Sequence, residues 1–193
     1  MFNDLIDFVD SLLPSVDPKA RDKAKAAIKQ FEEHGTPFEY LTHSLLPELS
    51  QGDIISEIPF MFFDADGSQQ IFNAKGMIIS TSCHIDQKKM LNIVPLLPIT
   101  FFAGNNNSQK ELKANRIYDY MYVPETGMDD YFIDFSKINT YDKSLILTGI
   151  EHQKIERLFS LSQHGYYLFI IKLTVFLMRK EDSGTAEHRT LSS

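Results

Sequence analysis

Apolar residues near the start of the chain recur at spacings of three and four positions, as on one face of a helix. In the stretch "FNDLIDFVDSLL" they are Phe2, Leu5, Ile6, Val9, Leu12 and Leu13. Pro14 ends this predicted helix, and Asp17 with Pro18 begins a second one that runs to Gly35. The second helix has many charges of both signs and few apolar anchors, which indicates a solvated helix on the domain or, alternatively, a partner-binding arm.

From Gln51 onward the pattern changes to β-branched and aromatic runs, which are typical of strands. The runs "DIISEIPFMFFD" and "QQIFNAKGMIISTSC" flank "DADG", whose Asp-Gly pair predicts a hairpin. The run "LNIVPLLPI" predicts a further strand, which Pro95 and Pro98 would confine to an edge or a bulge. A turn and short helix over "GNNNSQKELKANR" then lead to two more strands, "IYDYMYVP" and "DYFIDFSKI".

The final third of the chain is predicted to return to helix. The stretch "EHQKIERLFSLS" favours a short amphipathic helix, and "GYYLFIIKLTVFLMRK" favours a longer, almost wholly apolar one, although its composition also permits a buried strand. The polar end is expected to be disordered. We therefore predict an N-terminal helical segment over 1–48, a small β-barrel domain with C-terminal helices over 49–180, and a disordered tail over 181–193. The expected fold class is α+β, with a strongly bent antiparallel sheet or partly closed barrel between N-terminal and C-terminal helices.

Composition narrows the functional classes. Hydrophobic residues make up 43% of the 193 positions, enough for a sizeable core, and the net charge is -7. Nucleic-acid-binding proteins usually carry a strongly basic footprint, so any RNA site would be a local patch. The acidic start lacks the basic region of a signal peptide, and the apolar run 166–178 is short and interrupted by Lys172. The expectation is a soluble, cytoplasmic protein without membrane contact.

Three of these strands resemble conserved strands of the MazF/PemK small β-barrel toxins. They are "QGDIISEIPF", "KGMIISTSCHID" and "LNIVPLLPI". The ending "RLFSLSQHGYYLFIIKLTVFLMR" resembles that of a looser group of bacterial and phage barrel proteins that carry a Ser-x-x-Cys-Asp strand. The resemblance implies a toxin-like barrel of toxin-antitoxin or phage-defence type, which would bind RNA and could act as an endoribonuclease. It also implies a protein partner, either antitoxin-like or the subunit of a complex.

Two positions depart from these patterns. Lys75 stands near the place where MazF-like ribonucleases have an arginine for the scissile phosphate, and lysine lacks the planar fork of a guanidinium. His84 stands where the looser group has aspartate, so Asp86 would have to take over that role. Whether the protein is an enzyme is therefore left open.

The resemblance and the residue chemistry together give the candidate site residues. The candidate catalytic residues are Asp53, Lys75, Cys83 and Asp86, and the candidate RNA contacts are Lys75, Thr100, Lys172 and Arg179. The Asp53 carboxylate could act as a base or orient a partner, or it could simply accept backbone N–H groups at a turn. Asp134 is interpreted either as a solvent-facing strand residue or as the ion-pair partner of Lys137.

Cys83 is the single cysteine, which excludes an internal disulfide. With His84 and Asp86 it offers a nucleophile or metal ligands, but free cysteine is among the most buried residue types, so a structural role is favoured. No recognised metal-ligand spacing occurs, and no metal or cofactor is predicted.

The late basic residues have two interpretations. Lys172 and Arg179 would share one helix face with nearby tyrosines, as a phosphate-binding and stacking surface, or their stems would extend out of a buried helix to solvent. Three functions follow as hypotheses: a toxin-like RNA-binding protein, a non-catalytic protein-protein interaction module, and a Cys-based or metal-dependent hydrolase. The oligomeric state is not predicted.

Overall fold

The computed structural model describes residues 22, 26, 39–124 and 130–177. Most of the predicted N-terminal helical segment and the whole 181–193 tail lie outside the described residues. The helices are α3 (Ser82–Gln87), α4 (Asn106–Lys113), α5 (Lys143–Glu151) and α6 (Gln163–Leu177), with short 3-10 turns η1 (Ile99–Phe101) and η2 (Phe135–Lys137). The strands are β1 (Leu41–Thr42), β2 (Ile54–Phe63), β3 (Gln69–Ile78), β4 (Met90–Pro98), β5 (Tyr120–Val123), β6 (Tyr131–Asp134), β7 (Asn139–Asp142) and β8 (Arg157–Leu161).

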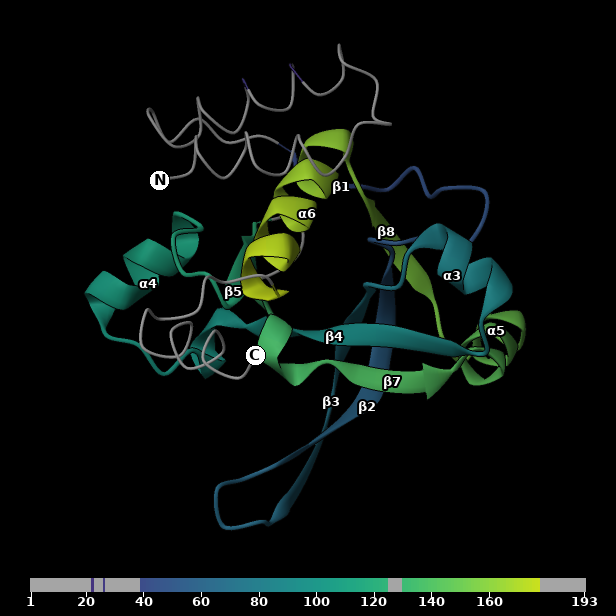
Figure 1. Cartoon of the computed structure of the whole chain (residues 1–193), viewed down its shortest axis with the longest axis horizontal. Coiled ribbons are helices and arrows are strands. Elements are labelled where there is room, and N and C mark those ends of the chain that lie inside the picture. The colour runs from purple at the N-terminus through teal and green to yellow at the C-terminus, as the bar shows by residue number, and fades with distance from the viewer. Residues whose placement is uncertain (1–21, 23–25, 27–38, 125–129, 178–193) are drawn as a thin grey trace, which may run out of the picture.

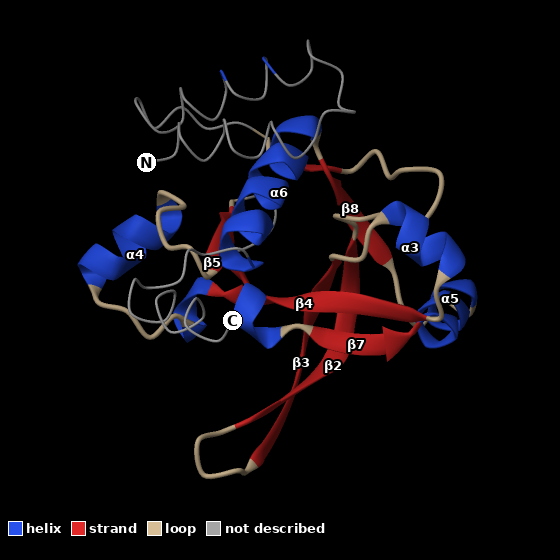
Figure 2. Ribbon diagram, viewed as in Figure 1, coloured by secondary structure: helices blue, strands red, loops and turns tan. Residues whose placement is uncertain are grey.

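The eight strands form one antiparallel sheet in the order β1-β8-β2-β3-β4-β6-β5, with β7 also paired to β4. This path ends at β1 and β5, so the sheet is bent but not closed among the described residues. The predicted α+β class with a strongly bent antiparallel sheet is confirmed. Figure 2 shows α4 near one end of β4, and α3 with α5 near the other.

Both faces of the sheet are covered by apolar residues. Along β4 the side chains alternate: Val94 and Leu96 belong to one buried cluster, and Ile93 and Leu97 to the other. The first cluster contains most of the buried face of α6, which crosses the sheet in Figure 1. The second contains one buried residue each from α3, α4 and α5, namely Ile85, Leu112 and Ile146. Burial on both faces explains the nearly continuous apolar run of β4.

Helix α6 lies directly against the chain that precedes β1. A Cβ built at Gly165 would stand 2.0 Å from the Tyr40 carbonyl oxygen, so only glycine permits this approach. The last apolar run forms helix α6 as far as Leu177. The predicted helix is therefore confirmed, and the alternative of a buried strand is wrong. No helix among the described residues has both the length and the apolar character needed to cross a membrane.

Strands β2 and β3 form the predicted hairpin. They pair from Ile54 opposite Met77 to Phe63 opposite Gln69, and Gly67 takes a φ of +81° in the connecting turn. The outer part of this hairpin projects beyond the rest of the sheet (Figure 1). Its side chains therefore lack the cover that helices give to the inner part.

The predicted edge position of β4 is wrong, because β4 pairs with β3 on one side and with β6 and β7 on the other. Strand β4 tolerates Pro95 because, on the side away from β3, its neighbouring strand changes from β7 to β6 at this position. The pairing with β7 ends at Ile93, and the pairing with β6 begins at Leu96. The N–H that proline lacks therefore falls at a break in the neighbouring ladder.

The helix predicted over "EHQKIERLFSLS" is also wrong. Helix α5 begins earlier, where the Asp142 carboxylate caps it by accepting the Ser144 N–H at 2.8 Å, and it ends at Glu151. The following residues from Arg157 to Leu161 form β8, in which Phe159 and Leu161 join the cluster under α6. Five residues are too few to separate a period of 2 from one of 3.6, and tertiary packing decided between them.

Candidate functional site

An open groove of about 680 Å³ lies between the outer part of the β2–β3 hairpin and the segment that follows β4. We call it the aromatic groove. Its lining includes six aromatic residues, Phe62, Phe72, Phe101, Phe102, Tyr120 and Phe132. This volume is within the range of ligand-binding clefts, and an apolar lining with few polar groups is their usual composition.

Three of these rings pack together and form the floor of the groove. Phe102, Tyr120 and Phe132 meet pairwise edge to face, with ring centroids 5.3 to 5.9 Å apart. Such contacts add to the stability that burial alone provides. On the hairpin side, Phe62 and Phe72 make a similar contact at 5.9 Å. The groove is thus held by contacts among its own walls.

Apolar side chains remain exposed along the groove and the hairpin. Phe101 is 72% exposed and Ile71 is 65% exposed, and both line the groove. Met61, opposite Ile71 in the ladder, and Phe63 on the same strand are exposed as well. Contiguous exposed apolar surface of this kind marks interaction sites more often than single apolar residues do.

The charged groups in the groove lining are Asp134 and Lys137, and they pair with each other. Asp134 is 2% exposed, and its carboxylate accepts from Lys137 Nζ at 2.5 Å and from the Ser136 hydroxyl at 2.6 Å. Lys137 Nζ also lies 5.4 Å from the centre of the Phe62 ring. Burial raises the pKa of Tyr120, and the carboxylates of Asp134 and Asp119 raise it further, against the opposing charge of Lys137. The ion pair expected between Asp134 and Lys137 is confirmed, whereas its solvent-facing alternative is wrong.

A second, smaller hollow of about 470 Å³ lies beside α3, and we call it the basic hollow. Lys88, Lys89 and His84 line it together with the hydroxyls of Ser80 and Thr81. The Thr81 hydroxyl lies 3.3 Å from His84 Nδ1. This arrangement offers cationic and hydrogen-bonding groups to an anion.

Asp53, a candidate catalytic residue, is fully buried at the junction of β2 and β8. Its carboxylate accepts from Arg157 Nη2 at 2.7 Å, from the Ser160 hydroxyl at 2.6 Å and from the Ser50 N–H at 2.9 Å. The interpretation of Asp53 as an acceptor of backbone N–H at a turn is confirmed by the Ser50 contact. Arg157 and Ser160 add an ion pair and a second hydrogen bond that sequence reasoning did not anticipate.

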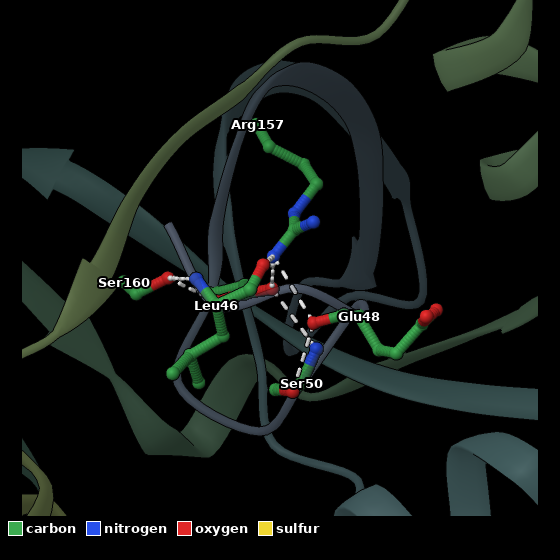
Figure 3. Close-up of polar contacts among 6 residues, drawn as sticks. Leu46, Glu48, Ser50, Arg157 and Ser160 are labelled. Carbon is green, nitrogen blue, oxygen red and sulfur yellow. Dashed lines mark hydrogen bonds and ion pairs between the residues drawn. The ribbon is translucent and has the colours of Figure 1, made fainter. Parts of the chain in front are cut away.

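Arg157 extends this buried cluster to the loop before β2. Figure 3 shows its guanidinium reaching the backbone of Leu46 and Glu48, where Nη2 donates to the carbonyl of Leu46 at 2.9 Å and to that of Glu48 at 3.1 Å. The Ser160 hydroxyl also accepts the Leu46 N–H at 3.3 Å. The cluster therefore fastens the loop to β8 through Arg157 Nη2 and the Ser160 hydroxyl, while the buried Nε of Arg157 has no hydrogen-bond partner among the described residues.

The other candidate catalytic residues lie on different elements. Lys75, on β3, donates from Nζ to the Tyr131 hydroxyl at 3.2 Å and lies 4.4 Å from the centre of its ring. Cys83 and Asp86 lie on α3, where both are exposed. The burial expected of Cys83 is wrong, because Thr81 caps a helix there and turns the chain out of the strand direction. Among the described residues, no group of three or more His, Cys, Asp or Glu is placed to hold a metal ion.

The candidate RNA contacts are also dispersed. Thr100 is exposed in η1, beside Phe101. Lys172 is 1% exposed, and its Nζ donates to the carbonyls of Asn115 at 2.9 Å and Ile117 at 2.5 Å. Arg179 lies outside the described residues. Neither the aromatic groove nor the basic hollow has a candidate catalytic or RNA-contacting residue in its lining.

Sequence reasoning missed the aromatic groove. Its walls come from segments between Phe62 and Lys137 that are far apart in the chain. One signal was present: the apolar pair Phe101 and Phe102 follows Pro98, outside any predicted strand. In the structure Phe102 packs against Tyr120 and Phe132, whereas Phe101 stays 72% exposed and adds to the apolar surface of the groove.

Comparison with known proteins leaves the family of this chain open. No protein-family model matches it, and no curated protein matches it. Among solved structures, one similar chain belongs to a structure described as MazE-MazF (Form-II) from Deinococcus radiodurans. The similarity has a TM-score of 0.38 at 11% identity and covers 68% of this chain and 97% of the other.

Proposed function

We propose that this protein is a non-catalytic interaction module that binds an apolar segment of a partner protein in the aromatic groove. The observation that carries the proposal is an open groove of about 680 Å³ whose wall residues Phe101 and Ile71 are mostly exposed. Burying such side chains against a partner removes apolar area from water at about 25 cal/mol per Å². Aromatic anchors in pockets are the groups that most often dominate binding energy.

The arrangement of the candidate catalytic residues supports binding over catalysis. A general base must lie within hydrogen-bond reach of the proton it removes. The Asp53 carboxylate is buried and already accepts three hydrogen bonds, while Lys75, Cys83 and Asp86 lie on β3 and α3. The aromatic groove, by contrast, needs no chemistry to act as a docking site.

Selection of peptides from a random displayed library against the full chain tests this function. Enriched peptides are expected to carry aromatic or large aliphatic anchors and to lose at least about tenfold in affinity when one groove anchor is truncated, as in Phe101→Ser or Ile71→Gln. Leu145→Ser is the matched control, because Leu145 is 60% exposed but lies on α5. Binding should be measured by fluorescence anisotropy. Enriched peptides that bind all three variants equally well, or a selection without enrichment, would overturn the proposal.

A second candidate function, RNA binding, is favoured by the basic hollow. Lys88, Lys89 and His84 are gathered there with two hydroxyls, and phosphate groups are bound by such sets. The sequence resemblance to MazF/PemK barrels supports RNA as the ligand, and Lys75 and Thr100 remain proposed contacts. The net charge of -7 limits such binding to a local patch.

Salt-dependent binding of a labelled mixed-sequence RNA tests this second function. Replacing Lys88 and Lys89 together by alanine should lower the slope of log affinity against log salt by about 1.4, since each phosphate contact to a single strand contributes about 0.7. Lys110→Ala, an exposed lysine on α4, is the control. The same incubation reports any cleavage of the RNA, and repeating it with Lys75→Ala shows whether cleavage depends on Lys75. RNA binding that is absent, or equally salt-sensitive in the double variant, contradicts this function.

A further inference from the structure

The lining of the aromatic groove offers no unpaired cation among the residues that the structure describes. Lys137 is the one cation there, and its Nζ pairs with the Asp134 carboxylate at 2.5 Å. An anionic ligand would therefore meet no free positive charge in the lining.

The hairpin side of the groove is acidic. Gln70 lines the groove, and its Nε2 donates to the Asp64 carboxylate at 2.8 Å, which holds that charge beside the lining. Two residues further on, Asp66 accepts the Ser68 N–H at 2.9 Å within the same turn, and this contact lowers the pKa of Asp66. Both carboxylates are exposed. They can therefore meet charges on a docked ligand.

These charges distinguish between partner classes. A single-stranded nucleic acid needs cations along its backbone as well as aromatic surfaces for its bases. The groove provides the aromatic surfaces, but the carboxylates on its rim, those of Asp64 and Asp66, repel phosphate. A protein segment with basic residues would be attracted by the same rim, which favours encounter and excludes acidic competitors.

We infer that the aromatic groove takes a segment of a partner protein in which an apolar anchor is flanked by lysine or arginine. This inference rests on the proposed function, since it specifies the chemistry of the partner that the groove binds. The anchor would lie on the floor made by Phe102, Tyr120 and Phe132, and the flanking cations would face Asp64 and Asp66.

The test uses the peptides enriched from the random library and the full chain. The expected result is an excess of Lys and Arg over Asp and Glu beside the apolar anchor. The best peptide is then synthesised in three forms that share the anchor and carry Lys, Ser or Glu at the flanks, and a mixed-sequence RNA of similar size is added as a fourth probe. The Lys form should bind about tenfold more tightly than the Glu form at low ionic strength, with the difference shrinking as salt screens the charges.

Two variants and a matched control separate the effect of charge from that of shape. Asp64→Asn should weaken the Lys form about threefold and leave the Ser form unchanged, because only the Lys form uses the carboxylate. Glu57→Gln removes one exposed charge near the base of the same hairpin and should change neither. Phe101→Ser should weaken all three forms alike.

The outcomes distinguish the inference from the function beneath it. Equal binding of the Lys and Glu forms, with Phe101→Ser still weakening both, overturns the charge preference and leaves the docking function standing. Loss of sensitivity to Phe101→Ser overturns both. Binding of the RNA probe that depends on Phe101 assigns the groove to nucleic acid and also overturns both.

Discussion

Replacement of Asp53 by alanine is expected to lower the free energy of unfolding by about 3–5 kcal/mol, the range for breaking one partner of a buried ion pair. Asp53 is 0% exposed and the Arg157 side chain is 15% exposed, so truncation leaves the guanidinium little access to water. The Ser160 hydroxyl and the Ser50 N–H lose their acceptor in the same step. Urea-induced unfolding of the full chain measures the effect.

Two further variants identify the cause. Combining Asp53→Ala with Arg157→Met should recover part of the loss, because the double variant no longer buries an uncompensated charge. Glu111→Ala is the control: its pair with Arg116 is exposed on both sides, and such pairs contribute no more than about 1 kcal/mol. A loss below about 1 kcal/mol for Asp53→Ala would show that the cluster does not hold the loop before β2.

The unfolding free energy is expected to rise from pH 7 to pH 9 through Lys172. Burial lowers the pKa of Lys172 to about 7, whereas an unfolded lysine titrates near 10.5. Between these values the unfolded chain holds a proton that the folded chain has released, so raising the pH favours folding. The slope is at most about 1.4 kcal/mol per pH unit, or about 2–3 kcal/mol over this window. Below about pH 6 Lys172 is protonated in both states and its contribution no longer changes.

Denaturant unfolding at several pH values, compared with Lys172→Met, isolates this effect. The methionine variant should lose most of the slope between pH 7 and pH 9, although it leaves the carbonyls of Asn115 and Ile117 without their donor. Lys154→Met replaces an exposed lysine and should keep the slope of the natural chain. The measurement stops at pH 9 because burial raises the pKa of Tyr40 and Tyr141. At higher pH these tyrosines lose their protons more readily in the unfolded chain, which lowers the free energy of unfolding. A slope unchanged in Lys172→Met would contradict the assignment.

The environment of Lys172 and that of Asp53 bear on the same functional question. Both residues were candidates for RNA chemistry, and both are buried with their polar atoms engaged by protein groups. Arg157, a further basic residue of the last third of the chain, likewise donates to Asp53 and to backbone carbonyls. The groups available to a partner lie elsewhere, in the aromatic groove and in the basic hollow. This distribution is why binding is proposed ahead of catalysis.

The sequence by itself determined those features that depend on neighbouring residues. Asp66-Gly67 specified the hairpin because glycine accepts the positive φ that its turn requires. The long apolar run after Gly165 specified α6, and the run from Leu91 specified β4. Each signal is local, so no knowledge of the rest of the fold was needed.

The tertiary structure decided the features that join distant residues. It placed Arg157 on a strand rather than a helix, and 104 positions separate it from Asp53, its partner. It also turned Cys83 outward on α3, although its residue type favours burial. The aromatic groove needs rings from the hairpin, from η1 and from β5 and β6 at once, and no single window of sequence contains them. One physical reason accounts for the position of Arg157, the exposure of Cys83 and the aromatic groove. Burial and pairing depend on which segments the sheet brings together, and the order of strands in the sheet follows from packing of the whole chain.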